Sequence, residues 1–388
     1  MLSISALACN LTGIAGTSGD AVASSVAATL SAEVISQESE FVLTDAEMLL
    51  PHSLYYLSES EEGITQVWRL EEDGITQTQL TFEPEAVLDY AVNPQNGSLA
   101  YVVSNRLLWV DREGAERRVL VEGVTVDGTA EEIYRGRISS PVWSPDGQTL
   151  VFGEGGITYF DMLSSTKRRL ITNEVEELEN GDLIPRRLYA PDMFSPDGSL
   201  LLVKISYHEG GTLAVFHQDS NELVIFKEGI VCCHPAWTMD GQVVVGSPYI
   251  GLIEPGLWLY DARSGEEQVL VSPISPDETF NFVGWPVQLP SGDFQYFYAS
   301  TAQYPEGDPD FSLVRTSSDG SSNRIVLRPE SFNDFRQALW APDASFIIVV
   351  QPEYGGSPSS QGPLLMISVD EIPIFPLGVN GSHMAWGP

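Results

Sequence analysis

The chain has 388 residues, of which 43% are hydrophobic and 10% aromatic, a composition that supports a packed core and excludes a disordered chain. Its 19 basic and 54 acidic residues give a formal net charge of −35. Because so negative a surface repels phosphate backbones, we expect no nucleic-acid partner; it suits cationic partners, or simply solubility in an extracellular or salty setting. The sequence contains no run of eighteen apolar residues, and it therefore predicts no transmembrane helix.

Residues 1–9 look like the tail of a signal peptide. Ala6-Leu7-Ala8-Cys9 resembles a bacterial lipobox, in which small residues precede the cysteine that becomes acylated, although leucine is usual where Ala6 stands and no basic region precedes it. Residues 10–45 are rich in Ser, Ala, Thr and Gly, as a flexible tether would be. These features predict a lipoprotein of the cell envelope or an extracellular protein, lipidated at Cys9; the alternatives are a truncated start or a chance match.

The first predicted strand is Ser53–Leu57, followed by Gln66–Leu70 and Thr76–Leu80. These three segments match the second, third and fourth strands of the repeat described next. No first strand precedes them.

A short phrase recurs from there to the end of the chain. Its clearest copies are Trp143-Ser144-Pro145-Asp146-Gly147 and Phe194-Ser195-Pro196-Asp197-Gly198, and successive copies lie 43 to 52 residues apart. A near-fixed period of this size indicates a propeller or a solenoid. Pro and Gly at these places suit a turn that closes a hairpin.

Each period contains four predicted strands. The phrase ends a first strand, and a continuous apolar run such as Leu200–Val203 follows it, as expected for a strand covered on both faces. A third strand alternates, as in Leu257–Asp261, and a polar turn leads to a fourth, such as Gln268–Val271. Four strands in a period of this length are typical of a propeller blade.

The last eight residues of the chain, 381–388, contain another copy of the phrase. Ser382–Trp386 reads as a first strand with nothing after it, whereas the first segment of the chain lacks a first strand. Joining the two completes one blade and removes an open sheet edge. The sequence therefore predicts an all-β fold over residues 46–388: a seven-bladed β-propeller of four-stranded antiparallel blades, closed by the C-terminal strand 382–386 in the N-terminal blade.

The repeated Ser-Pro-Asp-Gly turn resembles that of the TolB-like β-propeller family, and the resemblance covers roughly residues 50–388. TolB itself has six such blades and an N-terminal domain, so the resemblance implies architecture only. Relatives of this family commonly act as envelope binding proteins, or serve as the gating propeller of prolyl-oligopeptidase-like enzymes.

Motifs of catalysis are not found in the sequence. It has no Gly-x-Ser-x-Gly elbow, phosphate-binding loop, dinucleotide fingerprint or His-Glu-x-x-His. The turn aspartates Asp146, Asp197, Asp240 and Asp343 recur too regularly to be catalytic, and we expect them to bond amides of their own turns. We expect no cofactor, although Glu306, Asp308 and Asp310 offer hard oxygen ligands that could hold calcium.

The blades differ in their predicted loops. The second-to-third-strand loops are short in blades two and three and long in blades four to seven, and each long loop carries a tyrosine near its start: Tyr207, Tyr249, Tyr304 and Tyr354. Long inserts, Val124–Ile138 and Glu174–Tyr189, lie in connections on the same face. Tyrosine-bearing loops on one face predict a recognition surface, with merely tolerated loops as the alternative.

Charged and sulfur-containing residues are also expected near the channel mouth. Arg137, Arg187 and Arg336 come within a few residues of predicted first strands, where they could bind an anion or pair with nearby carboxylates. His234 opens the first strand of blade five behind Cys232 and Cys233. That pair is either redox-active or metal-touching, or two small buried thiols or a vicinal disulfide.

From these features we expect a non-catalytic exported or lipid-anchored scaffold that binds a protein, peptide or glycan through the blade four to seven loops. Two alternatives stay open. One is an enzyme, a lyase or hydrolase, with its site at the channel mouth; the other is a structural subunit of a larger envelope assembly, which would expose apolar patches on the outer strands.

Overall fold

The computed structural model describes residues 49–388 except 126, 208–209, 228–233, 249–253, 303–308, 334–336, 352–360 and 371–372. The chain divides into two units, Met1–Glu47 and Met48–Pro388, and the described residues all belong to the second. This unit is built almost entirely of antiparallel strands that pair with their neighbours in the sequence. The all-β class and the four-stranded antiparallel sheets predicted from the sequence are therefore confirmed.

Four sheets contain four strands each. Their members are β4 (Asp89–Val92), β5 (Leu99–Val103), β6 (Arg106–Val110) and β7 (Arg117–Glu122); β8 (Ile138–Trp143), β9 (Thr149–Glu154), β10 (Gly156–Asp161) and β11 (Thr166–Thr172); β17 (His234–Trp237), β18 (Val243–Ser247), β19 (Gly256–Tyr260) and β20 (Glu267–Val271); and β21 (Phe280–Gln288), β22 (Phe294–Thr301), β23 (Phe311–Thr316) and β24 (Ile325–Phe332).

Two sheets are larger. A five-stranded sheet consists of β12 (Glu174–Glu177), β13 (Leu183–Phe194), β14 (Leu200–Tyr207), β15 (Gly210–His217) and β16 (Glu222–Ile225). A seven-stranded sheet runs in the order β25 (Gln337–Trp340), β26 (Phe346–Val350), β27 (Gly362–Ser368), β28 (Phe375–Trp386), β1 (Leu54–Glu59), β2 (Thr65–Leu70) and β3 (Gln77–Gln79). A π-helical turn, η1 (Glu132–Gly136), precedes β8.

β28 explains why one sheet has seven strands. Its first half pairs with β27, as in Met366↔Phe375, and its second half pairs with β1, as in Leu54↔Trp386. One long strand thus serves as the outer strand of one group of four and the inner strand of the next. The backbone N–H of Gly387 also donates to the carbonyl of Ser53 at 2.9 Å, which ties the last residues of the chain to the start of the unit.

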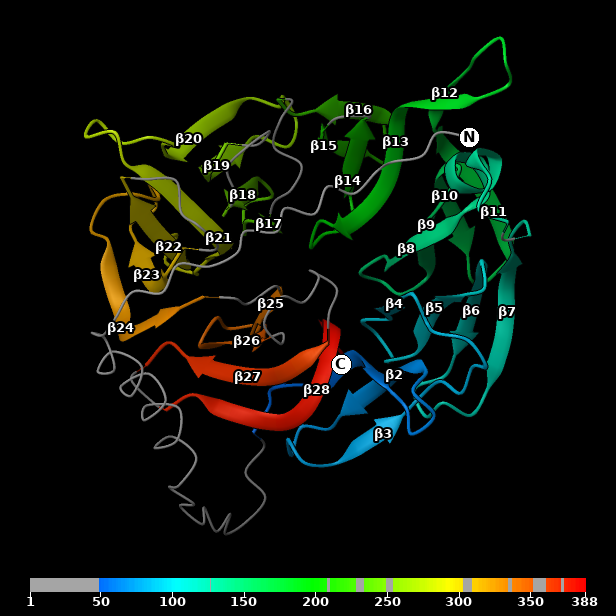
Figure 1. The fold of residues 1–388 in the computed structure, drawn as a ribbon, viewed down its shortest axis with the longest axis horizontal. Coiled ribbons are helices and arrows are strands. Elements are labelled where there is room, and N and C mark those ends of the chain that lie inside the picture. Colours follow the sequence, from blue (N-terminus) through cyan, green and yellow to red (C-terminus); the bar gives the residue numbers. More distant parts are fainter. Residues whose placement is uncertain are drawn as a thin grey trace, which may run out of the picture. The chain divides into compact units, whose positions relative to one another are not determined.

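The sheets lie side by side about a common centre, with β4, β8, β17, β21 and β25 nearest to it (Figure 1). The second strand of each group is buried on both faces, because adjacent residues point to opposite neighbours. In β14, for example, Leu201 packs towards β9 and Leu202 packs towards β18. This arrangement is the reason that these strands read as continuous apolar runs.

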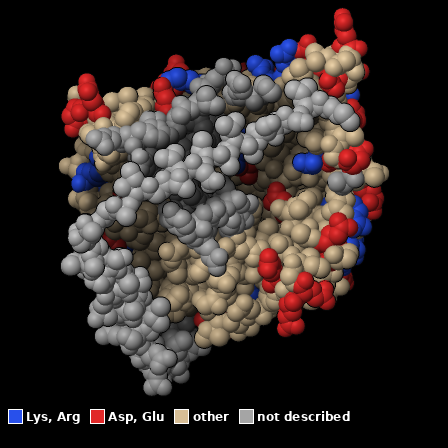
Figure 2. All heavy atoms as spheres, viewed as in Figure 1, with Lys and Arg blue, Asp and Glu red and all other residues tan. Residues whose placement is uncertain are grey.

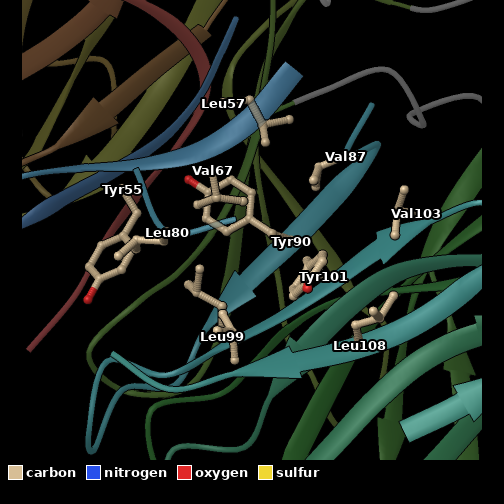
Figure 3. Packing of buried hydrophobic residues seen from close by; sticks show 11 residues of the cluster. Tyr55, Leu57, Val67, Leu80, Val87, Tyr90, Leu99, Tyr101, Val103 and Leu108 are labelled. Atoms are coloured by element: carbon tan, nitrogen blue, oxygen red, sulfur yellow. The ribbon is translucent and has the colours of Figure 1, made fainter. Parts of the chain in front are cut away.

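A separate hydrophobic cluster fills each contact between neighbouring groups of strands. Figure 3 shows one of them, in which Tyr55 and Val67 of β1 and β2 face Tyr90, Leu99 and Tyr101 of β4 and β5. Six further clusters of the same kind link the groups in chain order, and the last joins β26 to β1 through Ile348 and Leu54. Tight packing between sheets therefore supplies the core.

The turn aspartates behave as predicted from the repeat. Asp146 Oδ1 accepts hydrogen bonds from the Gln148 amide at 3.0 Å and the Ser144 hydroxyl at 2.5 Å. These bonds lower the pKa of Asp146, the Ser144 contribution being the largest, and the pKa values of Asp197, Asp240 and Asp343 are lowered in the same way by bonds within their own turns. The turn glycines adopt positive φ, and Ala344 takes the same conformation at φ 57° despite its side chain.

One expectation about the loops is corrected by the structure. The loop after Tyr207 is short and not long, because Tyr207 pairs directly with Gly210. The long insert after β11 contains a hairpin, in which Glu174–Glu177 pairs with the first part of β13 and extends one sheet (Figure 1). No helix among the described residues is long and apolar enough to cross a membrane.

Candidate functional site

Several inner strands contain a bulge at which a non-glycine residue adopts positive φ. The pairing register shifts at Ser140 in β8, at Trp285 in β21 and at His383 in β28. All three residues have positive φ, between 48° and 51°, although none is glycine. Bulges and strained backbone of this kind concentrate at sites that aim a side chain or an amide in a particular direction.

Each of the three bulges is held by the preceding group of strands. The Ser140 amide donates to Asp89 Oδ2 at 3.0 Å, the Trp285 amide to His234 Nδ1 at 3.3 Å, and the His383 amide to Gln337 Oε1 at 2.5 Å. The three acceptors begin β4, β17 and β25, so all six residues occupy the start of an inner strand or its bulge. They form one structural motif, a polar inner ring of side chains and amides that links neighbouring groups of strands.

Asp89 is the acidic member of this inner ring. Its Oδ1 accepts from the amide of Tyr90 at 2.9 Å, while its Oδ2 accepts from Ser140. Burial raises the pKa of Asp89, and the charges of His383 and Lys204 and the two backbone hydrogen bonds oppose that rise. The hydroxyl of Tyr90 donates to the carbonyl of His383, which joins the β28 bulge to β4.

Lys204 brings a positive charge close to the inner ring. Its ammonium group forms an ion pair with Asp192 of the neighbouring strand β13, and its side chain is 42% exposed against 13% for Asp192. The same charge acts on both Asp89 and His234, so Lys204 lies within electrostatic reach of two inner strands.

His234 is held as a neutral imidazole. Burial lowers its pKa to about 3, and the charge of Lys204 acts in the same direction. Its ring stacks on the Trp285 indole with centroids 3.9 Å apart, and because Nδ1 accepts the Trp285 amide, the ring proton resides on Nε2. A histidine in this state does not serve as a base that charges near neutral pH.

The two described arginines predicted at the channel mouth are each paired with a carboxylate. Arg137 binds Glu132 of η1 through two contacts of 3.1 and 3.3 Å, and Glu132 is almost completely buried. Arg187 lies 3.6 Å from Glu174 across the β12–β13 hairpin. Arg137 follows η1 and Arg187 lies within β13, so each has its own local partner.

Tyr207 lies beside Arg187. Arg187 interacts electrostatically with Tyr189 and Tyr207, and the Tyr189 hydroxyl donates to Glu174 at 2.7 Å. Burial, followed by the neighbouring Glu174, raises the pKa of Tyr189 to about 12. The structure thus brings one predicted tyrosine and one predicted arginine together on the same sheet.

Several predicted residues lie outside the described part of the chain: Cys9, Cys232, Cys233, Tyr249, Tyr304, Tyr354 and Arg336, together with Glu306 and Asp308 of the candidate calcium loop. Asp310 of that loop is described, and its Oδ1 accepts from Asn333 at 2.9 Å. Within the described ranges, no three His, Cys, Asp or Glu side chains gather as a metal site.

The sequence analysis missed Asp89, Ser140, Lys204 and Gln337. Apart from Lys204, these residues share a signal that could have found them: they stand three positions before the last residue of the inner strand, as His234 and His383 do. Lys204 gives no such signal, because it lies in a second strand and reaches the centre only through the fold.

A cavity of about 630 Å³ lies away from the inner ring, between β14–β16 and β18–β19. Asp197, Asp240 and Asp261 line it, and each of these carboxylates accepts hydrogen bonds within its own turn. Its acidic character is therefore a by-product of the turns. On the face shown in Figure 2, Asp and Glu side chains likewise lie mainly towards the outer parts of the described surface.

No protein-family model matches the sequence, and no curated protein matches it. Solved structures do match in fold. The chain is similar to a puromycin-hydrolyzing peptidase from Mycobacterium tuberculosis at a TM-score of 0.57 and 16% identity, over 84% of this chain and 51% of that one. The chain therefore spans about half the length of that peptidase.

Two further similarities extend beyond peptidases. An oligogalacturonate lyase in complex with manganese matches at a TM-score of 0.50 and 11% identity, over 81% of both chains. TolB from Acinetobacter baumannii matches at a TM-score of 0.44 and 15% identity, over 86% of this chain and 82% of that one. At these identities the similarities to the peptidase and the lyase show a propeller-like fold alone, and one fold can carry many unrelated functions.

Proposed function

We propose that this chain is a non-catalytic, seven-bladed propeller of the TolB-like kind that binds a protein, peptide or glycan partner on the face of the inner-strand starts. The proposal rests on the way in which its candidate catalytic groups are occupied. Arg137 and Arg187 pair with Glu132 and Glu174, and His234 accepts an amide while it stacks on Trp285.

The closed seven-bladed ring is part of this proposal. Seven hydrophobic clusters join successive groups of strands, and the seventh lies between β26 and β1. β28 supplies the inner strand beside β1. Closure of this kind removes the free sheet edges that would otherwise template aggregation.

The blade-four end of the recognition face supports a binding role. Arg187 has a side chain that is 39% exposed and lies beside Tyr189 and Tyr207, which pack in a hydrophobic cluster. Arginine is one of the residue types that dominate binding energy at protein interfaces. Tyr249, Tyr304 and Tyr354 would extend this surface across blades five to seven. Arg336 would contribute a cation to the same binding surface.

Export to the cell envelope and lipidation at Cys9 complete the proposal. A lipid-anchored propeller would hold its partner near a membrane, and a net charge of −35 would favour partners with basic surfaces. The match to enzymes is one of fold, and the chain spans only about half of the peptidase, so hydrolysis or elimination does not follow from it.

The test uses the full chain immobilised as bait for an envelope extract, with quantitative mass spectrometry of the retained proteins. The variant replaces four tyrosines by alanine: Tyr207, Tyr249, Tyr304 and Tyr354. It should retain each specific partner in an amount at least tenfold lower than the wild-type chain does. Met239→Ala, at an exposed turn away from the inner-strand starts, is the matched surface control and should keep them.

The competing enzyme function has its own readout. Purified protein is assayed with peptide p-nitroanilides and with oligogalacturonides, and no turnover above buffer is expected. Turnover that His234→Gln abolishes, or partners retained unchanged by the four-tyrosine variant, would overturn the proposal.

A further inference from the structure

The inner ring contains a partly exposed carboxylate, Asp89, for which the described residues supply no ion pair. Asp89 receives hydrogen bonds from two backbone amides, and within the described part of the chain no lysine, arginine or histidine forms an ion pair with it. A carboxylate offers about four lone-pair sites, and the two amides occupy two of them.

Other deeply placed carboxylates of this protein have a cationic partner. Glu83, Glu132, Glu154 and Asp192 have side chains 2 to 13% exposed, and they pair with Arg117, Arg137, Lys167 and Lys204 respectively. Glu83 makes the clearest contrast: burial raises its pKa, but the hydrogen bonds from Arg117 and Tyr101 outweigh that effect, so its pKa is lowered. Burial without such a partner raises the pKa of Asp89.

The surroundings of Asp89 suit a cation that comes from outside. Asp89 begins an inner strand and keeps partial exposure to solvent, as do Ser140, His234, Trp285 and Gln337 at equivalent places. The nearby positive charge of Lys204 is already compensated by Asp192. An added positive charge is therefore stabilised more beside Asp89 than at the other positions of the inner ring. The negative net charge of the protein also attracts cations.

We propose that Asp89 is the anchor of a binding site for a primary ammonium group, carried by a peptide N-terminus or by a polyamine. An ammonium group donates three hydrogen bonds and is compact, which fits a carboxylate with free lone pairs beside the narrow Ser140 and His383 bulges. The site uses none of the tyrosines of the proposed function, so either proposal can fail without the other.

The experiment is isothermal titration of the full chain with three probes: trialanine with a free N-terminus, N-acetyl-trialanine and spermidine. We expect trialanine, spermidine or both to bind, and the acetylated peptide to bind at least tenfold more weakly. Binding of trialanine without spermidine identifies a peptide terminus, and the reverse identifies a polyamine.

Two variants test the residue. Asp89→Asn keeps an oxygen acceptor for the Ser140 amide and removes the charge, and it should weaken ammonium binding at least tenfold. Asp219→Asn removes the same charge from an exposed turn and should leave binding unchanged. No binding of either amine at millimolar concentration, or equal binding by D89N and wild type, would overturn the proposal.

If D89N does not fold, the wild-type protein provides a second readout. Binding of trialanine should fall as pH is lowered from 7 and Asp89 becomes protonated, in surroundings that also include His383, Lys204 and Tyr90. A trialanine affinity that stays unchanged as the pH is lowered from 7 would equally exclude Asp89 as the anchor.

Discussion

Two boundaries between neighbouring groups of strands make the same contacts although the chain reaches them differently. At the β4–β8 boundary, the Ser140 amide bonds Asp89 and the Trp143 indole N–H donates to the Ala91 carbonyl at 3.2 Å. At the β25–β28 boundary, the His383 amide bonds Gln337 and the Trp386 indole N–H donates to the Trp340 carbonyl at 2.7 Å.

The two boundaries differ in the route of the chain. β4 and β8 begin two groups of strands that follow each other directly in the chain. The second half of β28, in contrast, pairs with β1 from the opposite end of the unit. Both boundaries combine an amide bonded to a polar side chain with an indole N–H bonded to a carbonyl, so this pair of contacts forms with either route of the chain.

Deletion of residues 381–388 should have the largest effect. It removes Met384 and Trp386, whose partial burial contributes less than the roughly 1.5–3 kcal/mol of a fully buried side chain each, and it exposes the edge of β1. We expect loss of a cooperative melting transition in calorimetry and aggregation in size-exclusion chromatography. Deletion of residues 1–40 is the control and should melt like the full chain; a C-terminal truncation that does the same would show that the two boundaries are not equivalent.

A second prediction concerns the third instance of the motif, in which His234 replaces the Asp or Gln acceptor. The pKa of His234 is about 3 in the folded protein against an ordinary value of 6.5, so the unfolded chain binds more protons between these values. The free energy of unfolding therefore falls as pH decreases through this window. From pH 7 to pH 4.5, His234 should account for a loss of about 2–3 kcal/mol.

The measurement is urea unfolding of wild type and His234→Gln at several pH values. His234→Gln keeps an oxygen that can accept the Trp285 amide. From pH 7 to pH 4.5, its free energy of unfolding should fall by about 2–3 kcal/mol less than that of wild type. His52→Gln is the control for removal of one imidazole. Parallel pH profiles for H234Q and wild type would contradict the buried neutral state.

The smallest effect tests the comparison most directly. Trp143→Phe and Trp386→Phe each remove one indole N–H that crosses a boundary and leave its carbonyl acceptor without that donor. Each should cost about 1–3 kcal/mol in denaturant unfolding. Because the geometry is shared, the two losses should agree within about 0.5 kcal/mol, and a much larger loss at Trp386 would mean that the chain route itself strains that boundary.

Much of the fold could be read from the repeat because its signals are local. Pro145, Asp146 and Gly147 encode a turn through their own backbone preferences, and the observed hydrogen bonds of Asp146 follow directly. Continuous apolar runs such as Leu200–Val203 indicate that both faces of a strand are covered. The site was harder to predict, because the sequence around Arg137 and Arg187 does not indicate which carboxylates pair with them.

The sequence by itself determined the turns, the four-stranded period and the chain segments that pair, since each depends on residues close together or on alternation of apolar side chains. Only the tertiary structure decided that Tyr207 ends a tight hairpin, that residues 174–187 form a β-arm, and that Lys204 acts on both Asp89 and His234. Charge and burial depend on what neighbouring sheets bring together. That is why the inner ring, and the carboxylate within it that no described residue pairs as an ion, could be found only in the folded chain.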